Sequence, residues 1–188
     1  MKKNNAFQKF LKSMRFRLIL LCLIVGILPC LVLRAGFLKA YEDQAASTRS
    51  IAIISQAKIL ADQIAANDYI NKQNTESITV QLNQLSNIYD GRVMLIDSAF
   101  RIVADTYGLD ETKTIISEEV VQSLSGKEIS KYDKESRYLE MTLPIKEANS
   151  TEVIGVMLVS VSMDSVLHDR DAVGRNAAIL TLIILSLI

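Results

Sequence analysis

The chain has 188 residues, of which 49% are hydrophobic, and its 21 basic and 21 acidic side chains give a formal net charge of zero. Its single histidine, His168, argues against a catalytic triad, and no glycine-rich loop ends in Lys-Ser or Lys-Thr to bind a phosphate group. The composition therefore excludes enzymes that depend on these two kinds of site.

The zero net charge results from two regions of opposite sign. Residues 1–17 carry six basic side chains and no acidic one, whereas every Asp and Glu lies between Glu42 and Asp171. Basic residues beside a membrane segment stay in the cytoplasm, where anionic lipids attract each of them by about 1 kcal/mol. We therefore expect a cytoplasmic amino terminus and an extracytoplasmic acidic region. Nucleic-acid binding is the alternative for such a cluster, but its attachment to an apolar segment disfavours a nucleic-acid partner.

An apolar run from Leu18 to Leu33 continues after Arg34 and reaches the length of about 20 residues that a membrane-spanning helix needs. A cleaved signal peptide is the alternative, but its apolar region is usually about 7 to 15 residues long and ends in a small-x-small site. We therefore expect an uncleaved transmembrane helix. Both cysteines, Cys22 and Cys30, fall within it, about 12 Å apart along the axis, too far for a disulfide within one chain.

A long helix is predicted after the membrane segment. From Ala40 to about Asn67 no proline or glycine interrupts the chain, and apolar residues recur at helical spacing. They are Ile53, Ala57, Leu60 and Ile64. This stripe is suited to packing on the chain's own domain, on a second copy, or on both. Because no helix breaker lies between the two helices, we expect the transmembrane helix to continue directly into this one.

The following residues predict a second helix and then five strands. The helix is expected from Glu76 to Ile88, with Ile78, Leu82 and Leu85 on one side. A hairpin is expected from two short apolar runs at 93–96 and 102–104, and a short amphipathic helix from Ile116 to Gly126. Three further strands, joined by short links that imply antiparallel order, are expected at 128–133, 137–145 and 152–163.

The last residues are again apolar but too few to cross a bilayer. The segment RNAAILTLIILSLI, residues 175–188, falls short of about 20 residues, and its carbonyl groups would end within hydrocarbon. We therefore expect residues 172–188 to be the start of a second transmembrane helix in a longer protein.

The connector before it contains His168 beside Asp169 and Asp171. This histidine is either a pH-responsive group or a solvated connector residue.

Four stretches together resemble the extracytoplasmic sensor region of bacterial two-component histidine kinases, of the PAS-like, single Cache type. They are the basic start with its span, the long helix, GRVMLIDSAFRIVADT at 91–106, and LPIKEANSTEVIGVMLVSVS at 143–162. The resemblance implies an α+β fold, a five-stranded antiparallel sheet with a long N-terminal helix, flanked by two transmembrane helices. One departure is Phe100, which stands where similar domains often have Gly or Asn. The resemblance therefore does not predict the type of this turn.

The resemblance also implies an organisation and partners. It divides the chain into a cytoplasmic basic terminus (1–17), a first transmembrane helix (18–38), an extracytoplasmic sensor domain (39–171) and a truncated second helix (172–188). It implies a homodimer in the bacterial cell membrane that detects an extracellular small molecule or protein. A missing cytoplasmic autokinase would use ATP and Mg and act on a response regulator. Alternatives are the same domain in a chemotaxis receptor or diguanylate cyclase, and a membrane-anchored structural or adhesion module.

The ligand pocket of such domains lies on the sheet, beneath the loops and short helix that follow the first hairpin. The polar and aromatic residues expected nearest to it are Arg101, Asp105, Tyr107, Arg137, Tyr138 and Glu140. Arginine binds carboxylates through two parallel hydrogen bonds, and tyrosine stacks or donates. The alternative is that these are exposed strand and hairpin residues. No catalytic or cofactor site is expected in this chain. No metal site is expected either, because paired acids such as Glu118 and Glu119 are typical of a solvated helix face.

Overall fold

The computed structural model describes residues 14–72, 76–147 and 150–164, together with His168, Arg175 and Ile179. The chain divides into two compact units, one made of Met1–Asp43 with His168–Ile188 and the other of Gln44–Leu167. Residues 1–13 of the predicted basic terminus and nearly all of the predicted second span lie outside the described residues. His168 is exposed, and Asp169 and Asp171, its predicted partners, also lie outside them.

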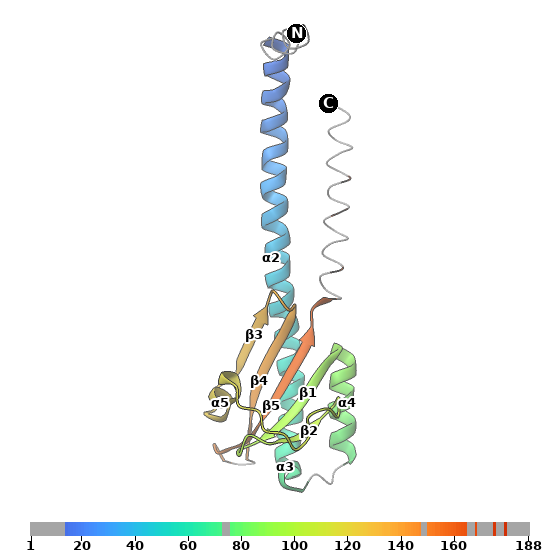
Figure 1. Cartoon of the computed structure of the whole chain (residues 1–188), viewed down its shortest axis with the longest axis vertical. Coiled ribbons are helices and arrows are strands. Elements are labelled where there is room, and N and C mark those ends of the chain that lie inside the picture. Colours follow the sequence, from blue (N-terminus) through green and yellow to red (C-terminus); the bar gives the residue numbers. More distant parts are fainter. Residues whose placement is uncertain are drawn as a thin grey trace, which may run out of the picture. The chain divides into compact units, whose positions relative to one another are not determined.

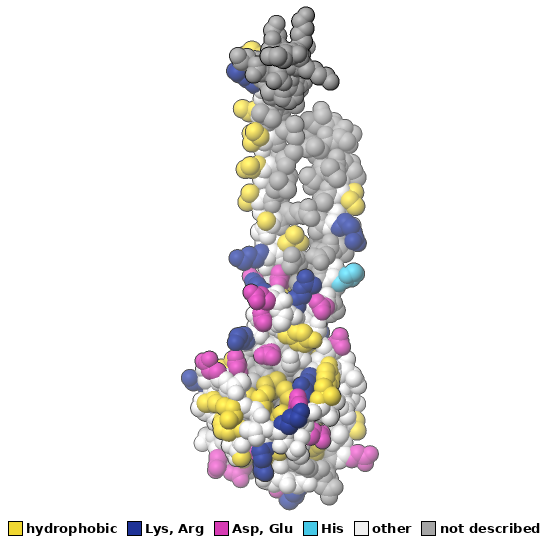
Figure 2. Space-filling view, in the orientation of Figure 1, with side chains coloured by type: hydrophobic (Ala, Val, Ile, Leu, Met, Phe, Trp, Pro, Cys, Tyr) yellow, Lys and Arg dark blue, Asp and Glu magenta, His cyan; other side chains and the backbone are white. Residues whose placement is uncertain are grey.

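Helix α2, Met14–Ala66, begins in the first unit and is continuous through Pro29 (Figure 1). The expected continuity between the apolar segment and the long helix is therefore confirmed. Hydrophobic side chains are exposed along the described part of this helix (Figure 2), among them Leu18, Val25 and Val32. Among the residues that can be described, no helix combines the length and the hydropathy of a membrane span. The span at 18–38 stays a prediction.

The second unit is built on a five-stranded antiparallel sheet in the order β2-β1-β5-β4-β3 (Figure 1). Its strands are β1 Gly91–Asp97, β2 Ile102–Asp105, β3 Ile129–Asp133, β4 Tyr138–Lys146 and β5 Val153–Ser162. The predicted hairpin and three further strands are confirmed. Strand β5 lies at the centre and pairs with β1 on one side and with β4 on the other. Its apolar residues on both faces fit this central position.

Three short helices accompany the sheet: α3 Tyr69–Lys72, α4 Glu76–Tyr89 and α5 Glu118–Leu124. Helix α4 confirms the predicted second helix, whereas α3 is absent from the sequence prediction. Helix α5 begins later than predicted, because Ser117 is its N-cap and accepts a hydrogen bond from the Val120 amide at 3.3 Å. Ile116 therefore lies before the helix and is exposed.

The two faces of the sheet have separate apolar clusters. On one face, alternate residues of β1, β4 and β5, such as Val93, Met141 and Met157, pack with α2, α3 and α4. The other face carries a smaller cluster with Met94 and Leu158, which Val120 of α5 joins. Side chains alternate along a strand, so β1 and β5 contribute to both clusters, whereas the buried apolar residues of β4 belong to the first cluster. Within the described part of the chain, the second face is covered by α5 and the loop before it, which contribute Val120, Leu124 and Ile115.

The turn between β1 and β2 explains the departure at Phe100. This residue has φ of +64°, a left-handed conformation that favours Gly or Asn. The Asp97 carboxylate holds the turn because it accepts hydrogen bonds from the backbone amides of Ala99 at 2.9 Å and Arg101 at 2.8 Å. The Phe100 ring packs against the second apolar cluster, which offsets the backbone strain.

Gly155 of β5 provides a test of this close packing. A Cβ at this position would lie 2.5 Å from Cδ1 of Ile70 and 2.6 Å from the carbonyl oxygen of Ile96. We expect Gly155→Ala to lower the free energy of unfolding by about 2 kcal/mol, within the usual range for overpacking, as measured by urea titration of the detergent-solubilised chain. Gly36→Ala is the control, because a Cβ there meets nothing within 4 Å. Equal unfolding midpoints for the two variants would contradict the packing described.

Candidate functional site

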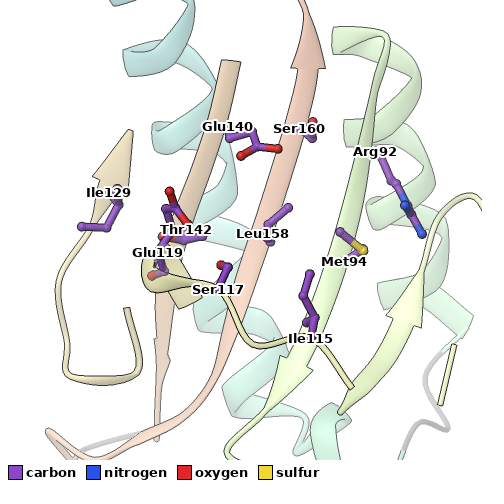
Figure 3. Close-up of a pocket in the computed structure, with 10 residues that line it drawn as sticks. All are labelled: Arg92, Met94, Ile115, Ser117, Glu119, Ile129, Glu140, Thr142, Leu158 and Ser160. Atoms are coloured by element: carbon purple, nitrogen blue, oxygen red, sulfur yellow. Dashed lines mark hydrogen bonds between the residues drawn. The ribbon is translucent and has the colours of Figure 1, made fainter. Parts of the chain in front are cut away.

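A pocket of about 210 Å³ lies on the sheet face that carries α5, the face opposite α2 (Figure 3). It is lined by residues of β1, β3, β4, β5, α5 and the loop before α5: Arg92, Met94, Ile115, Ser117, Glu119, Ile129, Glu140, Thr142, Leu158 and Ser160. This is the place at which the sequence analysis expects a ligand pocket. Two larger pockets, of about 440 and 540 Å³, lie instead along the edge strand β2.

The strand register arranges the floor of this pocket in two rows that cross four strands. The polar row contains, from β1 to β3, Arg92, Ser160, Glu140 and Lys131. The mainly apolar row contains Met94, Leu158, Thr142 and Ile129 in the same order. Side chains opposite each other in an antiparallel pair have Cβ atoms about 5 Å apart. A ligand on this floor therefore meets charge along one side and hydrocarbon along the other.

The cover of the pocket is tied to the floor by α5. Val120 of α5 is fully buried in the second apolar cluster. The Thr142 hydroxyl of β4 donates a hydrogen bond to the backbone carbonyl of Glu119 at 3.3 Å. Ser117 caps the helix immediately beside the pocket. The helix and its cap thereby place Ile115, Ser117 and Glu119 over the two rows.

Arg92 is held by two carboxylates on the β2 side of the pocket. Its Nε and Nη2 donate to the two oxygens of Asp105 at 2.8 and 2.6 Å, and Nη2 also donates to Asp110 at 2.7 Å. Asp110 in turn accepts from Lys113 Nζ at 2.6 Å. The ring of Tyr107 lies 5.9 Å from the guanidinium carbon, within cation–π range. Figure 3 shows Arg92 at the edge of the pocket.

Asp105 is the anchor of this ion-pair network. Its side chain is 0% exposed, and its oxygens also accept the backbone amides of Tyr107, Leu109 and Asp110 at 3.1, 2.9 and 3.1 Å. Hydrogen bonds from Arg92 chiefly hold the pKa of Asp105 well below its usual range, and Asp105 raises the pKa of Arg92. Both groups are therefore charged, and they fix the loop that follows β2.

The other two carboxylates of the pocket differ in their partners. Glu119 accepts a hydrogen bond from Lys131 Nζ at 2.9 Å, which lowers the pKa of Glu119 and raises that of Lys131. Glu140 lies beside Lys131 in the polar row, but among the described residues its carboxylate has no hydrogen-bond or ion-pair partner. It is a solvent-accessible carboxylate at the end of the pocket beside Ser160 (Figure 3).

The structure does not bring the six predicted site residues together. Glu140 alone lines the pocket beneath α5. Asp105 and Tyr107 line the pocket of about 440 Å³ beside β2, and Arg101 lines the pocket of about 540 Å³ beside the β1–β2 turn. Arg101 is paired with Asp97 at 2.8 Å. The remaining two, Arg137 and Tyr138, are exposed at the start of β4. Arg137 pairs with Asp164 at 3.5 Å.

Sequence reasoning missed most of the residues that line the pocket. Arg92 is the second residue of β1 and follows Asp90, a residue with positive φ, by two positions, so the sequence alone indicates an exposed strand end. Ser160 and Thr142 read as the polar positions of alternating strands. A signal was present in the last strand, where Ser160 and Ser162 end a row of apolar residues that face away from Met157 and Val159. A few polar groups placed beside apolar residues are typical of a small-molecule site.

Comparisons with known proteins establish the fold. No model of a protein family matches this sequence, and no curated protein sequence matches it. Among solved structures, the sensor domain of DcuS from E. coli is similar, with a TM-score of 0.56 and 15% identity over 66% of this chain and 96% of that chain. At this identity the similarity shows the fold alone. The predicted PAS-like, Cache-type α+β fold, with a five-stranded antiparallel sheet and a long N-terminal helix, is confirmed, and its transmembrane flanks stay a prediction.

Two further solved structures have lower scores. The sensory domain of the chemoreceptor Tlp3 from Campylobacter jejuni has a TM-score of 0.49 and 14% identity over 75% of this chain and 64% of that chain. The sensor domain of the histidine kinase DctB from V. cholerae has a TM-score of 0.46 and 16% identity over 69% and 57%. With TM-scores below 0.5, these two similarities add nothing to the assignment of the fold.

Asp105→Asn tests the ion-pair network. Removing one partner of a fully buried pair costs about 3–5 kcal/mol. Because 21% of the Arg92 side chain is exposed, we expect a smaller loss of about 2 kcal/mol in the free energy of unfolding at pH 7. Folding lowers the pKa of Asp105, so its stabilisation is complete above the ordinary value of 3.8 and is lost as the pH falls below it. Urea titrations at several pH values measure both effects.

The control for this experiment is Asp164→Asn, which removes the exposed ion pair with Arg137. Exposed ion pairs contribute little to stability, so this variant should unfold at the same urea concentration as the parent. The difference between the parent and Asp105→Asn should shrink in acid. A difference that is constant from neutral pH to below 3.8 would show that the Asp105 carboxylate does not stabilise the fold through its charge.

Proposed function

We propose that this chain is the input region of a membrane-bound sensor histidine kinase and that residues 44–164 bind an extracellular signal. The supporting observation is the pocket beneath α5, which lies in a sensor-domain fold with hydroxyl, carboxylate and apolar groups aimed at one space. Few convergent polar groups in a largely apolar pocket are typical of small-molecule sites. The sequence resemblance to histidine kinases suggests the output, and no catalytic group is expected in this chain.

Signal transfer in this proposal runs through the packing of the sheet. Ile53, Ala57 and Ile64 of α2 are fully buried against the sheet face opposite the pocket. Each strand that lines the pocket contributes its alternate residues to that contact. A ligand changes the state of the domain only by binding one arrangement more tightly than another, with couplings of about 1–3 kcal/mol in typical cases. Helix α2 is the element that receives this change, because it continues without a break from Ala66 back to Met14.

The proposal includes partners outside this chain. A second copy would complete a homodimer in the bacterial cell membrane. ATP and Mg would bind only to a cytoplasmic kinase core, which would phosphorylate a response regulator. A phosphoacceptor histidine on a helix, followed by an ATP-binding domain, would distinguish the kinase from a chemotaxis receptor or a diguanylate cyclase with the same input domain. A structural or adhesion module would lack a linker helix after the second span.

Cysteine labelling tests the topology. In a background with Cys22→Ala and Cys30→Ala, Glu135→Cys places a thiol in the exposed turn between β3 and β4, and Lys3→Cys places one in the basic terminus. A membrane-impermeant maleimide should label the first variant in intact cells and the second only after lysis, because the positive end stays inside. Labelling of both variants only after lysis would place the domain in the cytoplasm and contradict the proposal.

A chimera tests the sensor function. The cytoplasmic part of a characterised histidine kinase is joined after Ile188, and autophosphorylation is measured in vesicles with millimolar amines, amino acids and dicarboxylates as separate probes. We expect at least one class to change the rate. Ser160→Leu should abolish the response because the larger side chain occupies the pocket, whereas Ser162→Leu, two residues along the same strand and outside the pocket lining, should retain it. Identical rates for the parent and Ser160→Leu with every probe would refute a sensing role of this pocket.

A further inference from the structure

Arg92 is the cation that lines the pocket, yet it is committed to other groups. Three of its hydrogen bonds go to Asp105 and Asp110. Turning the guanidinium toward a ligand would leave Asp105 without its main partner, and the side chain of Asp105 is 0% exposed. An unpaired buried charge is strongly unfavourable. Arg92 is therefore a support for the loop after β2, and its positive charge is already neutralised by carboxylates of the chain.

Lys131, the other cation of the polar row, is also occupied. Its ammonium group lies 2.9 Å from Glu119, and the charges of Glu140 and Glu118 act on it as well and raise its pKa. One lysine is thus shared among three carboxylates. A ligand carboxylate near Lys131 would compete with Glu119 and meet repulsion from Glu140. The β3 side of the pocket disfavours an anion for this reason.

The groups in and around the pocket leave one negative charge unmatched. Among the described residues, the carboxylates that line the pocket or form an ion pair with Arg92 or Lys131 are Asp105, Asp110, Glu119 and Glu140, and the cations paired with them are Arg92, Lys113 and Lys131. Asp110 is matched by Lys113 at 2.6 Å. Glu140 is the carboxylate for which the described residues provide no hydrogen bond or ion pair, and it points into the row beside Ser160. The pocket accordingly presents a free acceptor for a cationic donor.

The rest of the lining defines the body of such a ligand. Met94 and Leu158 are buried, and each lies two residues along its strand from a residue of the polar row. They therefore offer hydrocarbon and sulfur next to the Glu140 carboxylate. A volume of about 210 Å³ is below the range of about 300–1,000 Å³ that accommodates drug-sized ligands. We propose, on the basis of the sensor function above, that this pocket binds a small alkylammonium or alkylguanidinium ion, with its charge at Glu140 and its alkyl chain on Met94 and Leu158.

Binding of matched probes to the detergent-solubilised full chain tests this ligand class. The probes are n-butylammonium, butyrate and n-butanol, which share one alkyl chain and differ in charge, and binding is measured by saturation-transfer NMR and calorimetry. We expect n-butylammonium to bind at least about tenfold more tightly than either other probe. Higher salt concentration should weaken this binding, because an accessible ion pair is screened.

Variants of Glu140 separate its charge from the shape of the pocket. Glu140→Gln should weaken n-butylammonium binding about tenfold, and Glu140→Lys should reverse the preference toward butyrate. Glu135→Gln removes the same charge from the exposed β3–β4 turn and should bind like the parent. Unfolding midpoints equal to that of the parent show that a loss of binding in a Glu140 variant is not a loss of fold.

The outcomes distinguish this inference from the proposed function. The cationic ligand class is overturned if butyrate binds as tightly as n-butylammonium or more tightly. It is also overturned if Glu140→Gln binds n-butylammonium as tightly as the parent does. The sensing function is then decided by the chimera alone. Absence of n-butylammonium binding at millimolar concentrations also overturns the class. Binding that Ser160→Leu leaves unchanged also overturns the inference, because it places the probe outside this pocket, and it leaves the sensing function to the chimera.

Discussion

The pairing of β5 with both β1 and β4 is the constraint on which the rest of the domain depends. Because side chains alternate along a strand, Met157 and Val159 face the helices while Leu158 and Ser160 face the pocket. A slip of the register by one residue would exchange these two sets. Gly155 allows the strand to approach Ile70 and the backbone of Ile96 closely. The position of the pocket is therefore a consequence of how this strand packs.

Most of the fold follows from the hydrophobic pattern. The stripe at Ile53, Ala57 and Ile64 correctly predicts the buried face of α2, and the doubly apolar last strand correctly predicts a central position. The pattern fails for short elements. Helix α3 has one turn, too short for a periodic signal, and the start of α5 is decided by the Ser117 hydroxyl, which competes with any helical pattern that begins at Ile116. Local hydrogen bonds set such boundaries, and periodicity does not report them.

The site was less predictable than the fold because its charges are decided by pairs distant in sequence. Arg101 and Arg137 were expected to bind a ligand, but each has a carboxylate partner, Asp97 and Asp164. Arg92 lies 13 residues from Asp105, and their contact depends on the β1–β2 hairpin register together with the loop that follows. A residue type indicates which hydrogen bonds and ion pairs a side chain is able to form. Only the folded chain shows whether those bonds are already made.

In the proposed sensor, the charge of the ligand decides whether the binding energy at this pocket is as large as the coupling energy that signalling requires. Two opposite charges about 4 Å apart attract by about 1 kcal/mol in bulk water and by about 4 kcal/mol at an effective dielectric constant near 20. Glu140 is accessible to solvent, so its contribution lies toward the lower value until a ligand and the cover at Ser117 and Ile115 exclude water. Couplings between sites are typically about 1–3 kcal/mol. An ion pair between a bound cation and Glu140 is therefore comparable in energy with such a coupling, whereas the apolar contact with Met94 and Leu158 depends on the buried area at about 25 cal/mol per Å². In the proposed sensor, the charge of the ligand contributes more to the energy available for signalling than the size of the pocket does.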